Sequence, residues 1–154
     1  MKFYPSIHDR LNNQHLVIGE LIKDLRVEQL VIHPHPDKWN IHENIAHLAK
    51  YQQVFMDRIN KIVNNNGISF PPYKAEDDPE FELWVSWNTN ELFQTILTDR
   101  LKIIELLNNI KEPEINHTAF HLKYGRLNIT EWTEFFLLHE AHHLFTIFQI
   151  VHNK

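Results

Sequence analysis

Apolar residues recur at three- and four-residue spacing in four long stretches of the chain, and this spacing predicts four helices. The first covers residues 6–30 and ends where two closely spaced prolines follow it. The second begins at the capping box formed by Asn40 and Glu43. It ends in the sequence Asn-Asn-Asn-Gly at residues 64–67, which is typical of a helix C-terminus.

A third amphipathic stretch covers residues 79–110, and an Asn-Thr-Asn sequence inside it marks a kink or a break. The connection before it, residues 71–79, is polar and contains several prolines, a composition suited to covering the mouth of a pocket. Residues 111–127 contain a proline and a glycine and show no clear period. We therefore interpret them as a loop, which carries His117 and His121.

A second capping box, Asn128 with Glu131, opens the last helix, which runs to about residue 152. No pattern of strands separates the helices. Four long helices in a chain of 154 residues predict an all-α fold, a four-helix bundle in one domain over residues 1–154. The connections are long enough for crossovers, so the pattern alone does not determine the connectivity of the bundle.

Composition and charge exclude several classes of protein. The chain has 15 basic and 20 acidic residues, and its Lys and Arg are scattered, which argues against a nucleic-acid partner. The first residues lack the apolar run of a signal peptide, and no segment approaches about twenty apolar residues. We expect a cytoplasmic protein without membrane contact. Cysteine is absent, so any thiol chemistry would use the sulfur of a small molecule.

Two of the twelve histidines are placed where they could form half of a metal site. His139 and His143 are four residues apart in the last predicted helix, so they lie on the same face. Trp132 and Phe136 continue that face, which places both imidazoles toward the interior. Burying them without partners costs free energy, and either a metal ion or a structural hydrogen-bond network would remove that cost.

The segment from His139 to His143 also fits the H-E-x-x-H motif of zinc proteases. These proteases take a third ligand further along the chain, but here Thr146 and Gln149 stand where the extended motif has Gly and His. A di-iron bundle requires two Glu-x-x-His units. Glu140 and His143 supply one, whereas the second helix offers a glutamate and a histidine at the wrong spacing. A single ion held by histidines fits better.

The third ligand must come from another helix, and His47 is the best-placed candidate. It lies inside the second helix beside the apolar stripe, after Trp39 and a capped start. Three neutral imidazoles, from His47, His139 and His143, leave a fourth position open to water or substrate, as in a catalytic zinc site. The histidines that we interpret as solvated or simply hydrogen-bonded are His8, His15, His33, His35, His42, His142 and His152.

Four stretches of the chain are informative when taken together. They are Trp39-Asn-Ile-His-Glu-Asn-Ile-Ala-His-Leu48, Phe81-Glu-Leu-Trp84 with Arg100, His121-Leu-Lys-Tyr-Gly-Arg-Leu-Asn-Ile129, and Leu138-His-Glu-Ala-His-His-Leu144. In their order and spacing they resemble the DinB-like (DinB/YfiT) superfamily of metal-binding four-helix bundles. The resemblance extends over essentially the whole chain. It implies a mononuclear divalent ion, zinc or nickel, held by His47, His139 and His143.

The resemblance also implies an enzyme that acts on a small-molecule substrate. Members with known activity resemble thiol-dependent S-transferases or isomerases that use bacillithiol or mycothiol, so we expect transfer of a low-molecular-weight thiol to an electrophile. A metal-dependent hydrolase and a non-catalytic metal- or ligand-binding stress-response protein are the alternatives. A homodimer is also expected. Tyr51, His121 and Glu140 could assist the reaction, although we favour a structural role for each.

Overall fold

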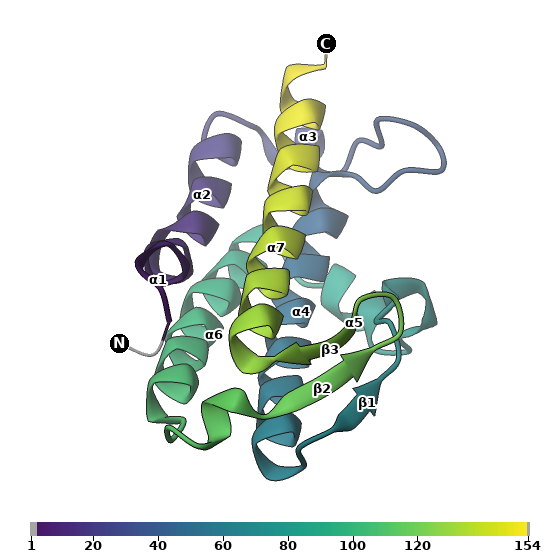
Figure 1. Ribbon diagram of the computed structural model, residues 1–154. Helices are drawn as coiled ribbons and strands as arrows, with labels where there is room; N and C mark the ends of the chain where they lie inside the picture. Colours follow the sequence, from purple (N-terminus) through teal and green to yellow (C-terminus); the bar gives the residue numbers. More distant parts are fainter. Residues whose placement is uncertain (1–2, 154) are drawn as a thin grey trace.

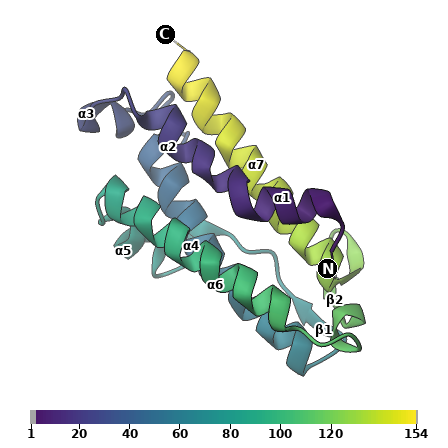
Figure 2. The ribbon, with the colours of Figure 1, turned by 90° about the vertical axis from the view of Figure 1, so that its left-hand side faces the viewer.

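Four long helical segments form the body of the molecule, and a small sheet lies beside one end of it (Figures 1 and 2). The computed structural model describes residues 3–153. The first segment consists of α1 (Pro5–Asn13), the 3-10 turn η1 (Gln14–Leu16) and α2 (Val17–Ile22). The other three are α4 (Ile41–Asn64), α6 (Thr89–Asn109) and α7 (Ile129–His152). The predicted four-helix bundle is therefore confirmed.

The shorter elements connect these segments. They are the helices α3 (Val27–Leu30) and α5 (Phe81–Val85), the 3-10 turns η2 (Ala75–Asp77) and η3 (Glu114–Asn116), and the strands β1 (Ile68–Phe70), β2 (Thr118–His121) and β3 (Gly125–Asn128). Within the described residues, none of the helices combines the length and the apolarity that crossing a membrane requires.

The two helices that carry the candidate ligands begin where the sequence predicts. The Asn40 side chain accepts a hydrogen bond from the backbone N–H of Glu43, whose carboxylate accepts one from the Asn40 N–H. Asn128 and Glu131 form the same pair of bonds at the start of α7. Each capping box satisfies two backbone donors that the first helical turn would otherwise leave unpaired.

The other two predicted helices are interrupted. The first, expected over residues 6–30, contains the turn η1 and ends at Ile22, and α3 is a separate single turn. The third divides into α5 and α6, because Asn88 forms a new capping box with Glu91 and restarts the helix there. The break expected at the Asn-Thr-Asn sequence is thus confirmed.

The loop predicted over residues 111–127 is wrong, and so is a purely all-α fold. The segment contains η3 and the antiparallel pair β2–β3, and β1 pairs in parallel with β2 on its other side. Gly125 adopts a positive φ of 76°, which a residue with a Cβ rarely adopts. Strands of three or four residues contain too few positions to show a period of two clearly.

The interior consists of two apolar clusters with a polar layer between them. Phe55, Ile103 and Phe136 belong to the cluster nearer the sheet. Ile45, Ile96 and Leu144 belong to the other, so the same three helices contribute to both. Between these residues each helix contributes a buried polar side chain to the layer, Gln52 in α4, Arg100 in α6 and Glu140 in α7. The candidate metal ligands lie at the same level of the bundle.

Candidate metal centre

The three histidines singled out in the sequence lie together in the structure. His47 comes from α4, and His139 and His143 come from successive turns of α7. One ring nitrogen from each lies within 4.8 Å of the others, and the Nε2 atoms of His47 and His139 are 3.0 Å apart. A tetrahedral ion bonded to two nitrogens at about 2.0–2.1 Å holds them about 3.3 Å apart. The three rings thus have nearly the spacing that one ion requires.

Burial keeps the three imidazoles in the neutral form that binds metals. Burial and, to a smaller extent, the neighbouring imidazoles of His143 and His139 lower the pKa of His47 to about 2. Burial likewise lowers the pKa of His139 to about 3 and that of His143 to about 4. Because only a deprotonated ring nitrogen can coordinate a metal ion, these residues need no proton loss to bind one near neutral pH.

Asn44 determines which nitrogen of His143 is available. Its Oδ1 lies 2.8 Å from His143 Nδ1, and its amide nitrogen donates to the backbone carbonyl of Asn40. The amide oxygen can only accept, so His143 Nδ1 carries the proton and Nε2 keeps its lone pair. Among residues 3–153, the Nδ1 atoms of His47 and His139 have no such partner. The donor set of three neutral imidazoles therefore fits a zinc or nickel ion.

Aromatic rings enclose the histidine cluster. The ring centroid of Trp39 lies 5.0 Å from that of His47 and 6.0 Å from that of His143. The ring centroids of Tyr51 and His139 are 4.0 Å apart, and Tyr73 stacks on His47 with its ring centroid 5.8 Å away. These rings exclude water from one side of the cluster and so strengthen electrostatic interactions inside it.

Tyr73 belongs to the proline-containing connection between β1 and α5, which covers the histidines as its composition suggests. The Tyr73 hydroxyl donates to Asp78 at 2.8 Å, and burial together with this carboxylate raises its pKa. Lys50 of α4 forms ion pairs with Asp78 and Glu80 and so fastens the connection to the bundle. The cover over His47 is therefore held by two ion pairs, of which the one with Asp78 is largely shielded from solvent and the one with Glu80 is exposed on the glutamate side.

Two cavities reach the cluster from outside. A cavity of about 540 Å³ is lined by His143 together with Trp39 and Asn44. A second, of about 730 Å³, is lined by His139 and by residues of the β2–β3 hairpin and α7. The exposed His142 lines both. A small molecule in either cavity would therefore lie beside one of the candidate ligands, an arrangement that a closed structural metal site does not have.

Comparison with known proteins places this chain in a family. Residues 17–147 match the family model of the DinB superfamily. The chain belongs to the DinB superfamily. The resemblance stated from the sequence is thereby confirmed.

A solved structure supports the same fold. YfiT from Bacillus subtilis, described as a probable metal-dependent hydrolase with an unusual four-helix bundle topology, superimposes with a TM-score of 0.79. The match covers 94% of this chain and 83% of YfiT, with 11% sequence identity, so it establishes a shared fold. No curated protein matches the chain by sequence.

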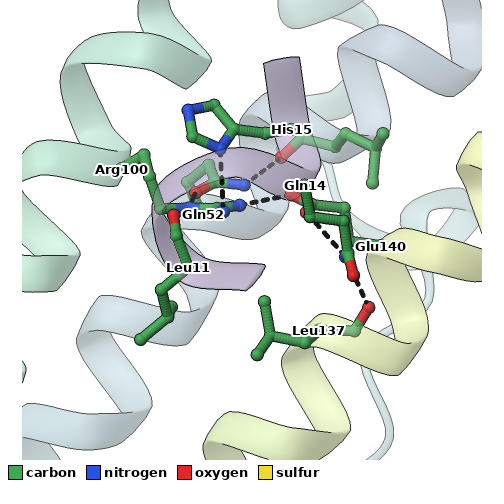
Figure 3. A network of polar contacts seen from close by, with 8 residues as sticks. Leu11, Gln14, His15, Gln52, Arg100, Leu137 and Glu140 are labelled. Atoms are coloured by element: carbon green, nitrogen blue, oxygen red, sulfur yellow. Dashed lines mark hydrogen bonds and ion pairs between the residues drawn. The ribbon is translucent and has the colours of Figure 1, made fainter. Parts of the chain in front are cut away.

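In this DinB superfamily chain, Glu140 is not placed to act as the base of a zinc protease. Its carboxylate is buried and engaged by other segments, because it forms an ion pair with Arg100 of α6 and accepts a hydrogen bond from Gln14 of η1 (Figure 3). The absence of strands expected from the sequence does not count against a protease, because a three-stranded sheet is present. The position of Glu140 is the stronger argument.

His121 and His15 have structural roles. His121 Nδ1 accepts hydrogen bonds from the backbone N–H groups of Lys123 and Tyr124, which holds the turn between β2 and β3. His15 is buried, and its Nδ1 accepts from Arg100 in the network shown in Figure 3. His15 is thus hydrogen-bonded, as expected, although it was not expected to belong to a buried ionic network.

The sequence interpretation missed two residues of the site, Asn44 and Tyr73. Asn44 lies three residues before His47, so helical spacing places both on one face, and this signal was available. Tyr73 lies in an irregular segment, where no periodicity predicts the direction of a side chain.

Proposed function

We propose that this chain is a metal-dependent enzyme that holds one zinc or nickel ion through His47, His139 and His143. The observation that carries this proposal is the convergence of three neutral imidazoles beside two cavities. A protein that used these histidines only for packing would have no need of access to them from outside. The description of the structurally similar YfiT as a probable metal-dependent hydrolase supports the proposal.

The residues of the chain would each contribute to this activity by holding groups in place. The three imidazoles supply neutral nitrogen donors, and Asn44 fixes the tautomer of His143. Trp39, Tyr51 and Tyr73 shield one side from water, while the cavities admit a small-molecule substrate. A divalent ion in such a site lowers the pKa of a thiol or a water molecule that binds to it.

The leading reaction is transfer of a low-molecular-weight thiol to an electrophile. The thiol sulfur forms a bond to the electrophilic carbon, the leaving group departs with the electrons of the broken bond, and the thiol proton passes to solvent. The chain contains no cysteine, so the sulfur would come entirely from the substrate. Hydrolysis is the second candidate, and the description of YfiT favours it.

The reaction is tested with the purified protein loaded with zinc or with nickel. Each form is assayed with bacillithiol, mycothiol or another small thiol and a chromogenic electrophile, and separately with activated esters and amides. We expect turnover that a chelator abolishes and that a variant with all three histidines changed to alanine lacks. Equal turnover in that variant would refute the proposal, and metal binding without turnover would instead identify a binding protein.

A further inference from the structure

The cavity next to His139 has an apolar wall that the metal centre itself does not explain. Its apolar side chains come from three separate parts of the chain, and we call this surface the apolar groove. It is formed by Tyr4, Tyr124, Leu127, Phe135 and Leu138. Figure 1 shows the β2–β3 hairpin, which contributes Leu127, beside the first turns of α7.

Several of these side chains are exposed to solvent even though they are large and apolar. Leu138 is 57% exposed and Tyr124 is 52% exposed. A volume of about 730 Å³ lies within the range of small-molecule sites, roughly 300–1,000 Å³. Because His139 lines the same cavity, the groove borders the candidate metal centre.

The charges along the groove define which molecules suit it. Among residues 3–153, its charged lining residues are Glu131 and Glu134, with no Lys or Arg. Glu134 is paired with Arg10, and Glu131 accepts a hydrogen bond from the N-terminal backbone of α7. The groove therefore presents apolar surface with a weakly negative edge, which disfavours an anionic group.

We propose that the apolar groove binds an uncharged, aliphatic or aromatic part of the substrate whose reactive group reaches the histidine cluster. This inference rests on the proposed function and specifies its substrate class. The substrate would be a small molecule with a polar reactive end and an apolar end without negative charge. The cavity at His143, which is lined by polar residues including Asn44, would then remain for the second reactant.

The test measures binding rather than turnover. Hydroxamates chelate metal ions, so acetohydroxamate reports on the metal centre alone, and butano-, hexano- and octanohydroxamate add an apolar chain of increasing length. Their affinities for the zinc-loaded protein are measured by isothermal titration calorimetry. We expect the affinity, relative to acetohydroxamate, to rise by up to about fourfold for each buried methylene.

Variants locate the effect on the groove. Leu138→Ser and Tyr124→Ala each remove apolar surface from the groove. The control is Leu101→Ser, which replaces an exposed leucine of α6 that lies outside the groove. We expect the two groove variants to show a weaker dependence of affinity on chain length and the Leu101→Ser control to keep the wild-type dependence. Suberic acid monohydroxamate, which ends in a carboxylate, should bind more weakly than octanohydroxamate.

The outcomes separate the groove from the metal centre. If acetohydroxamate binds but chain length has no effect, or if the two groove variants keep the wild-type dependence, the groove proposal is overturned and the metal centre stands. If Leu138→Ser changes only the oligomeric state, the groove is a contact with a second copy and the proposal is likewise overturned. If acetohydroxamate does not bind the zinc-treated protein, the proposed function fails and the groove proposal fails with it.

Discussion

At the scale of single residues, Asn44 offers a way to perturb the candidate metal centre without changing a ligand. Replacing it with leucine removes the acceptor that holds the proton on His143 Nδ1. We predict that Asn44→Leu weakens zinc affinity by about 10- to 100-fold, the range for loss of a hydrogen-bond partner to a ligand. The affinity is measured by competition with a chromogenic chelator.

Asn44→Asp is the matched control for this substitution. Aspartate keeps an acceptor of the same size at the same place and adds a negative charge, which favours a bound cation. Zinc affinity should therefore stay at the wild-type level or increase. If leucine and aspartate weakened the affinity equally, the effect would come from helix packing and the role assigned to Asn44 would be wrong.

His15 makes the stability of the protein depend on pH. Burial, and then the Arg100 guanidinium, lower its pKa from 6.5 to about 4. Between these values the unfolded chain binds a proton that the folded chain does not, so the free energy of unfolding falls as the pH falls. One such residue contributes a slope of up to about 1.4 kcal/mol per pH unit.

We predict that His15→Gln reduces this slope by about that amount in the metal-free protein. Glutamine can accept the hydrogen bond from Arg100 through its amide oxygen but does not titrate. Urea unfolding between pH 4 and pH 7 in the presence of a chelator, compared between variant and wild type, measures the difference. An unchanged slope would mean that His15 is protonated in the folded protein.

At the scale of elements, the sequence predicted the parts that carry the ligands better than the parts that surround them. The helices α4 and α7 each have 24 residues, many turns of regular apolar spacing and a capping box, so local signals agree along their whole length. The pair His139 and His143 follows from helical spacing alone. His47 was the best-placed candidate in the second helix, but choosing it required the additional assumption that two distant helices pack together, which helical spacing does not establish.

The elements that were missed are short and depend on tertiary contacts. The strands β1 and β2 pair in parallel although about fifty residues separate them, and no local pattern encodes that pairing. The neighbouring β2–β3 hairpin contributes Tyr124 and Leu127 to the apolar groove, so the groove could not be predicted either. The first helix was predicted as continuous because the turn η1 keeps its apolar residues near helical spacing.

The ion pair between Arg100 and Glu140 connects α6 to α7 inside the polar layer (Figure 3). Both side chains are 1% exposed, so removing one leaves an uncompensated buried charge. We predict that Glu140→Leu destabilises the protein by about 3–5 kcal/mol. The double variant with Arg100→Met should lose much less than the sum of the two single changes. Urea unfolding of all four proteins gives these values.

The ion pair between Arg10 and Glu134 is the matched control for this cycle. It joins α1 to α7, but its side chains are 29% and 27% exposed. Glu134→Leu should therefore cost about 1 kcal/mol or less. Additive effects at Arg100 and Glu140 would show that the two charges do not interact strongly, contrary to their placement in the structure.

At the scale of the whole molecule, the homodimer implied by the family resemblance stays a prediction. Sedimentation equilibrium of the purified protein over a range of concentrations measures the mass of the species in solution. We expect a mass of about twice the 18.5 kDa of one chain. A mass of one chain at all concentrations would refute the dimer and would leave the metal centre unaffected, because all three of its histidines belong to one chain.

The whole account depends on three histidines of the bundle holding one metal ion. Elemental analysis of the protein, loaded with zinc or nickel and then freed of excess ion by gel filtration, tests this claim most directly. We predict about one ion per chain in the wild type. His47→Ala should bind far less while keeping its helical circular dichroism. A wild type without stoichiometric metal, or a folded variant lacking all three histidines that keeps it, would contradict the account.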